Sequence, residues 1–152
     1  MIRAKAVSRY QFGIDATNAL FRGNMELVIS RKTGKIRNVI SDGEHVLSMR
    51  AGDGLYTLKK SGADRIVSAV PAPFMRVMVT DDAAPCVSEG RNVFCPFVIE
   101  CDGELRPMEE VMVTNIKDEV VATGRMILTA DEIRSFKRGV AVKVRSGTGD
   151  EA

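Results

Sequence analysis

The stretch VSEGRNVFCPFV (residues 87–98) joins a short acidic, helix-like run to an apolar strand through a Gly-Arg-Asn turn. Gly90 in this turn has two interpretations. Glycine commonly supplies the left-handed residue that follows a helix, so the turn can be a plain helix stop. A residue without a side chain also leaves the backbone bare, so that a phosphate or a ribose can approach it closely. The stretch alone does not decide between them.

Short strands surround this turn. Alternating apolar residues and turn signals predict strands over residues 76–80, 91–100, 111–115, 119–128 and 138–145, with two short helices over 81–90 and 129–136. Pro96 implies a sheet edge, a bulge or a strand start at its position. In the last strand, alternation sends Val140, Val142 and Val144 to the core and the residues between them outward. This part of the chain is predicted to form a small mixed β barrel.

The first half of the chain has a different pattern. Helical spacing covers residues 1–20, short strands follow, with Asp42-Gly43 as a hairpin turn, and a helix is predicted over 59–70. A small antiparallel sheet flanked by helices is expected. The fold class is therefore α+β, and the Pro-Ala-Pro sequence at 71–73 separates two domains. We expect an accessory domain over 1–74, the barrel over 75–146 and a disordered tail over 147–152.

Charge is distributed unevenly between these two parts. Residues 1–74 carry 12 Lys and Arg against 6 Asp and Glu (+6), whereas residues 75–152 carry 10 against 14 (−4), which gives the overall +2. A basic half is suited to a polyanion, although scattered surface charges give the same count. No apolar run approaches the roughly 20 residues of a membrane helix, and the N-terminus has no secretory h-region. A cytoplasmic protein without a membrane partner is expected.

Catalytic and metal-binding motifs are not found in the sequence. It contains no nucleophile elbow, metalloprotease, P-loop or dinucleotide-binding pattern. The single histidine, His45, follows a hairpin turn and has no evident partner. The three cysteines, Cys86, Cys95 and Cys101, do not have C-x-x-C spacing, so small structural residues are favoured over a zinc site. We expect no enzyme activity and no cofactor.

Two clusters of basic residues indicate nucleic-acid binding. The sequence SRKTGKIR (residues 30–37) places four cations on one hairpin, and FKRGVAVKVR (136–145) places four more around the last strand. Clusters of this kind either bind the phosphates of a nucleic acid or are solvated surface charges without a partner. Aromatic residues make up 5% of the chain, so shape and backbone recognition of folded RNA is favoured over base stacking. The hairpin cations are Arg31, Lys32, Lys35 and Arg37.

A strand, a short helix, a turn with glycine and basic residues and a second strand follow one another, and the barrel region closes with FKRGVAVKVR. This order resembles that of the PUA domain, a small RNA-binding pseudo-barrel. Seven fragments in order resemble the C-terminal region of archaeal tRNA-guanine transglycosylases of the archaeosine pathway. This similarity covers about residues 3–146. The fragments are YQFG, SRKTGKIRNV, DGEHVLSMRAGDGLYTL, EGRNVFCPFV, LRPMEEVMV, ATGRMIL and FKRGVAVKVR.

The resemblance implies that 1–74 is the accessory domain that precedes PUA in those enzymes. It also implies that both parts grip tRNA, with the PUA domain holding the acceptor stem and its 3′ end. It further implies a set of RNA contacts: Gly90, Arg91, Asn92, Arg138, Gly139, Lys143 and Arg145. At Cys95-Pro96 the family leads us to expect a small residue followed by a basic one, so one charge is missing here. A (β/α)₈ catalytic barrel needs about 250 residues, which exceeds this chain.

The sequence therefore predicts a non-catalytic protein that binds tRNA or other structured RNA, and that acts in trans with a transglycosylase or another RNA-modifying enzyme. The alternative is a protein–protein adaptor that keeps the fold without RNA contacts. The −4 charge of the second half and the missing charge at Cys95-Pro96 favour this alternative.

Overall fold

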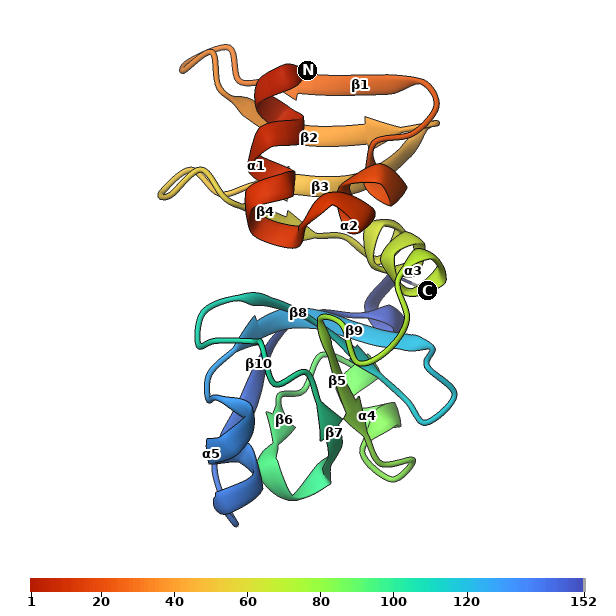
Figure 1. The fold of residues 1–152 in the computed structure, drawn as a ribbon, viewed down its shortest axis with the longest axis vertical. Coiled ribbons are helices and arrows are strands. Elements are labelled where there is room, and N and C mark those ends of the chain that lie inside the picture. Colours follow the sequence, from red (N-terminus) through yellow and green to blue (C-terminus); the bar gives the residue numbers. More distant parts are fainter. Residues whose placement is uncertain (152) are drawn as a thin grey trace. The chain divides into compact units, whose positions relative to one another are not determined.

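The computed structural model describes the chain over residues 1–151 and its side chains over 1–149. It divides into two compact units, Met1–Val70 and Pro71–Ala152, where the sequence predicted a boundary near residue 74. Each unit has its own sheet (Figure 1). The predicted α+β class and the predicted division into two domains with separate sheets agree with this structure.

The first unit is a four-stranded antiparallel sheet with helices packed against it (Figure 1). The strand order is β1-β2-β3-β4. Its elements are α1 (Ile2–Phe12), α2 (Ile14–Leu20), β1 (Met25–Ile29), β2 (Ile36–Ser41), β3 (Glu44–Met49), β4 (Tyr56–Leu58) and α3 (Lys60–Ala69).

Local sequence explains these elements. Asp42 and Gly43 have φ values of 49° and 81°, the left-handed pair that a two-residue hairpin turn between β2 and β3 requires. Tyr56 joins β4 to α1, because its hydroxyl donates to the Ala4 carbonyl oxygen (3.0 Å) and its backbone exchanges two hydrogen bonds with the Gln11 amide. Burial raises the pKa of Tyr56 to about 12, so this hydroxyl stays a donor.

The second unit is a six-stranded sheet in the order β6-β10-β9-β8-β5-β7, in which only β5 and β8 pair in parallel. Its two terminal strands are consecutive in the chain, so the sheet curls into a nearly closed barrel around an apolar core. The elements are β5 (Arg76–Val79), α4 (Ala84–Ser88), β6 (Val93–Phe94), η1 (Cys95–Phe97), β7 (Val98–Cys101), β8 (Glu110–Thr114), β9 (Val120–Met126), α5 (Ala130–Ser135), β10 (Val140–Gly147) and η2 (Thr148–Glu151).

Three expectations for this unit are corrected. The strand predicted over 91–100 is two strands separated by the 3-10 turn η1, because Pro96 has no N–H to donate to a ladder. Ala141 is fully buried, not outward, because the register against β6 shifts between Val140 and Val142. The tail predicted as disordered begins inside β10, which ends at Gly147, and η2 follows. Residue 152 lies outside the described residues.

Candidate nucleic-acid interface

The Gly90 turn is built as a helix stop. The N–H groups of Gly90 and Arg91 donate to the carbonyls of Val87 and Cys86 at 3.0 and 3.2 Å, which closes the last turn of α4. Gly90 has φ 103°, a conformation that side-chain-bearing residues rarely adopt. The backbone of this turn also lies against β10. A Cβ on Gly147 would be 2.2 Å from the Ser88 carbonyl oxygen and 2.8 Å from the Gly90 nitrogen.

Asn92 connects the same turn to β10. Its side-chain Oδ1 accepts a hydrogen bond from the Val144 N–H at 3.0 Å, just before the short strand β6 begins. The side chain therefore extends the β6–β10 pairing by one bond. Arg91, in contrast, is exposed. Of the RNA-binding residues predicted in this turn, Asn92 has a structural role and Arg91 has a side chain available to a ligand.

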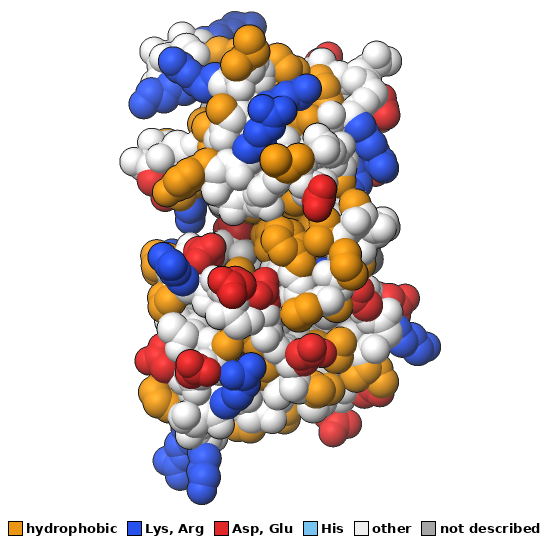
Figure 2. All heavy atoms as spheres, in the orientation of Figure 1, with side chains coloured by type: hydrophobic (Ala, Val, Ile, Leu, Met, Phe, Trp, Pro, Cys, Tyr) orange, Lys and Arg blue, Asp and Glu red, His pale blue; other side chains and the backbone are white. Residues whose placement is uncertain are grey.

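Arg138 and Gly139 lie at the opposite end of β10. Gly139 has φ 103°, and its carbonyl accepts a hydrogen bond from the Cys95 N–H at 3.0 Å, which fixes the turn after α5 onto η1. Arg138 and its neighbour Lys137 are exposed on this turn. Figure 2 shows Lys and Arg side chains at the tip beyond α5, on a unit whose visible face is otherwise rich in acidic groups. Gly139 and Gly147 are eight positions apart, roughly 25 Å along an extended strand.

Lys143 and Arg145 occupy the outward positions of β10 between these two ends, as predicted. Arg145 forms a two-pronged ion pair with the almost fully buried Glu110 of β8, with N–O distances of 2.8 and 2.6 Å. Its charge is therefore largely compensated. Lys143 is exposed, and its cross-strand neighbour is Arg125 of β9. Arg125 is also the register partner of Glu110 on β8, so Glu110, Arg125 and Lys143 lie in one row across three strands, and Arg145 is the ion-pair partner of Glu110.

Arg125 was not predicted from the sequence. Strand alternation could have placed it outward, but the pairing that brings it beside Lys143 depends on the register of two strands, which the sequence does not show. The predicted residues thus form a strip along β10 and do not converge on one point. Within residues 1–149, whose side chains are described, Arg91, Arg138 and Lys143 have no ion-pair partner.

The hairpin cations of the first unit lie on the turn between β1 and β2 and, in the case of Arg37, at the start of β2. Arg31, Lys32, Lys35 and Arg37 are all exposed, and backbone hydrogen bonds from Ser30 to Lys35 and from Gly34 to Ser30 close the turn. Figure 2 shows Lys and Arg side chains gathered around this hairpin at the upper left. They form a compact cationic surface on the first unit.

His45, Cys95 and Cys101 have shifted pKa values. Burial, with the nearby Lys59 charge, lowers the pKa of His45, whose ring nitrogen pairs with Ser48 Oγ at 3.0 Å. Burial raises the pKa of Cys95, and burial together with Asp102 raises the pKa of Cys101 to about 11, so both thiols stay protonated and weakly nucleophilic at neutral pH. Among the described residues, no group of three His, Cys, Asp or Glu side chains could hold a metal ion, and no helix is long and apolar enough to cross a membrane.

Comparisons with known proteins find a matching domain family for each unit. Residues 2–73 match the patch-forming domain C2 of tRNA-guanine transglycosylase, and residues 75–148 match the PUA domain. The chain is 42% identical over 145 residues to the tRNA-guanine(15) transglycosylase of Methanobrevibacter smithii, and 46% identical over 142 residues to that of Thermococcus kodakarensis. These alignments cover 95% and 93% of this chain but only 22% and 24% of the relatives, so the chain spans about a quarter of their length.

Solved structures support the fold. A PUA domain protein from Thermoplasma acidophilum superposes with a TM-score of 0.70 at 23% identity, covering 99% of this chain and 91% of that one. A PUA domain from Aeropyrum pernix superposes with a TM-score of 0.71 at 16% identity, covering 98% and 82%. Together with the sequence matches, they confirm the resemblance: the chain is a PUA-domain protein whose C2 and PUA domains correspond to the C-terminal region of archaeal tRNA-guanine transglycosylases.

Proposed function

We propose that the chain binds tRNA along the β6–β10 surface of its PUA domain and acts with a tRNA-modifying enzyme. The observation that carries this proposal is the strip of exposed cations, Arg91, Lys143 and Arg138, that follows β10. Phosphate contacts from such side chains supply affinity and orientation. Gly139 and Gly147, near the two ends of β10, are at most roughly 25 Å apart, and cations spread along a strand of this length suit an extended RNA backbone more than a small ligand.

The relatives support the choice of tRNA. They are named tRNA-guanine(15) transglycosylases, and the matched segment is their C-terminal C2 and PUA region. If that region holds tRNA for the relatives, the same two domains here deliver tRNA to a catalytic domain. We propose that residues 1–74 form the accessory domain and residues 75–146 form the PUA domain. The cationic hairpin Arg31, Lys32, Lys35 and Arg37 is a second phosphate-facing surface in this proposal.

The salt dependence of tRNA binding tests the proposal. Each phosphate that is no longer neutralised should reduce the slope of log affinity against log salt concentration by about 0.7–0.9. Lys143→Ala is therefore expected to lower the slope by the equivalent of about one phosphate and to weaken binding several-fold at low salt, as measured by fluorescence anisotropy with labelled tRNA. Lys117→Ala, an exposed lysine on the β8–β9 turn, is the matched control. Equal slopes for Lys143→Ala and the unchanged protein would contradict the assignment.

The adaptor function is the second candidate, because the second half of the chain carries a net charge of −4 despite this strip. It predicts tight binding to a protein partner together with no measurable tRNA affinity at low salt.

A further inference from the structure

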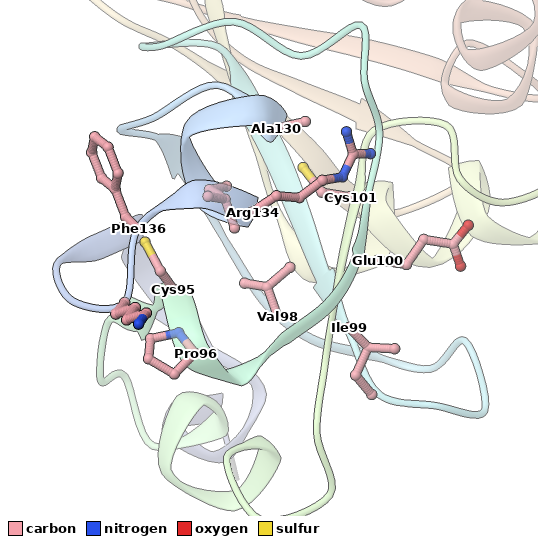
Figure 3. A pocket seen from close by; sticks show the side chains of 11 residues that line it. Cys95, Pro96, Val98, Ile99, Glu100, Cys101, Ala130, Arg134 and Phe136 are labelled. Atoms are coloured by element: carbon pink, nitrogen blue, oxygen red, sulfur yellow. The ribbon is translucent and has the colours of Figure 1, made fainter.

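A groove lies between β7 and α5 of the PUA domain, away from the Gly90 turn. Its volume is ≈ 500 Å³, within the size range of ligand sites. Figure 3 shows Ile99 and Glu100 of β7 on one side, Ala130 and Arg134 of α5 above, and Val98 in the middle. Apart from the charged groups, the lining is mostly apolar: Cys95, Pro96, Val98, Ile99, Cys101, Ala130, Ile133 and Phe136.

The strand beside this groove is a sheet edge. β7 is the terminal strand of the six-stranded order and pairs only with β5. The Asp102 N–H donates to the Arg76 carbonyl of the β5 side at 3.0 Å. Because successive residues of a strand direct their backbone groups to opposite sides, the N–H and C=O of Cys101 face away from β5. The edge is short, its register shifts between Met78 and Val79, and Cys101 is 8% exposed, so an added strand reaches these backbone groups only through the groove that Cys101 lines.

Side chains around the edge are unusually apolar for a surface. Ile99 is 54% exposed and Phe136 is 46% exposed, and both line the groove. The neighbouring Phe97 is 41% exposed. An edge strand flanked by apolar side chains and a helix provides pockets for alternate side chains of an extended peptide.

The charged side chains of the groove favour acidic peptides. The lining contains two cations, Arg134 and Lys137, and one carboxylate, Glu100. Arg134 also contacts Asp131 at 3.1 Å, but this pair is exposed and weak, so the guanidinium can turn to a new partner. In Figure 3 the Arg134 side chain extends across the groove toward Cys101. The helix side of the groove therefore complements acidic groups.

We propose that this groove binds an extended polypeptide segment of a protein partner, which alternates apolar and acidic side chains and adds as a strand to β7. The apolar side chains occupy the space between Val98, Ile133 and Phe136. The acidic side chains pair with Arg134 and Lys137. This proposal does not rest on RNA binding, because the groove contains none of the residues assigned to tRNA.

The test uses the full chain and three fluorescein-labelled probes: a peptide of alternating valine and glutamate, the same peptide with lysine in place of glutamate, and oligo(U) RNA. The acidic peptide is expected to bind within the roughly millimolar range or tighter, at least about tenfold better than the lysine peptide. Hydrogen exchange at the Cys101 amide, followed by NMR, is expected to slow when the acidic peptide binds.

Two variants distinguish peptide binding in the groove from a general effect of net charge. Arg134→Glu should weaken acidic-peptide binding about tenfold, because an attractive partner becomes repulsive. Lys117→Glu, which makes the same charge change on the β8–β9 turn, should leave it within about twofold. Both positions are exposed, so the fold should be kept, and circular dichroism checks this.

Four results would overturn the proposal. They are no saturable binding of the acidic peptide, equal binding of both peptides, binding that leaves the Cys101 amide unprotected, and protection of that amide without peptide through self-association. Protection by oligo(U) instead of the acidic peptide would assign the groove to RNA and would equally reject a peptide partner.

Discussion

Replacing Arg138 and Lys143 together by glutamate is expected to weaken tRNA binding at least about 100-fold at physiological salt, because two phosphates lose their cationic partners and two repulsive charges are added. Both side chains are exposed and have no ion-pair partner among residues 1–149, so the free energy of unfolding should change little. Anisotropy titrations with labelled tRNA measure the affinity, and urea unfolding checks the fold.

The control is Arg106→Glu with Lys117→Glu, which makes the same change in net charge at exposed positions of the same unit, away from β10. This double variant should lose no more than several-fold in affinity through long-range repulsion. If the two double variants bound tRNA equally well, net charge alone would account for binding and the β10 strip would be rejected.

The second large effect concerns stability. Arg76 is buried at the start of β5, with 2% of its side chain exposed, and its Nε lies 2.7 Å from Oδ1 of Asp118. The Nε–H is not aligned for a hydrogen bond with this oxygen, so the contact is an ion pair. Asp118→Asn removes the opposite charge while retaining tolerance of the left-handed backbone at this position, where φ is 62°. Unfolding is expected to become easier by about 3 kcal/mol, because the buried guanidinium loses the opposite charge of Asp118.

Urea denaturation with an unchanged slope measures this change in the free energy of unfolding. Asp131→Asn is the comparison, because it breaks the exposed pair with Arg134; the side chains of Arg134 and Asp131 are 67% and 94% exposed. That change should cost no more than about 0.5 kcal/mol. If both substitutions lowered the free energy of unfolding equally, the burial of Arg76 would not determine the strength of its ion pair with Asp118.

Much of the fold follows from the sequence because its signals are local. Strand alternation, the Asp42-Gly43 turn and the glycine after α4 each depend on a few neighbouring residues. The errors arise where a long-range register decides the outcome. Ala141 is buried because the β10 register shifts against β6, and the strand around Pro96 divides because a missing N–H ends one ladder before the next begins.

The same distinction applies to the site. Exposed cations such as Lys143 could be predicted from alternation, whereas the pairing of Arg145 with Glu110 joins residues 35 positions apart on β10 and β8. The hydrogen bond from Val144 to Asn92 and the position of Arg125 also require the folded sheet. The family resemblance assigned RNA contact to all seven predicted residues alike. In the structure, however, the side chains of Asn92 and Arg145 have partners within the fold.

The central claim, that the PUA domain holds tRNA along β10, is tested most directly by binding to bulk tRNA over a salt series, with intact tRNA and with tRNA trimmed of its 3′ end. We predict affinity that falls steeply with salt and falls further on trimming, because the Gly90 turn and Arg91 at the end of the strip would contact the 3′ terminus. No binding at low salt would contradict the claim and leave the Gly90 turn with its structural role as the helix stop of α4.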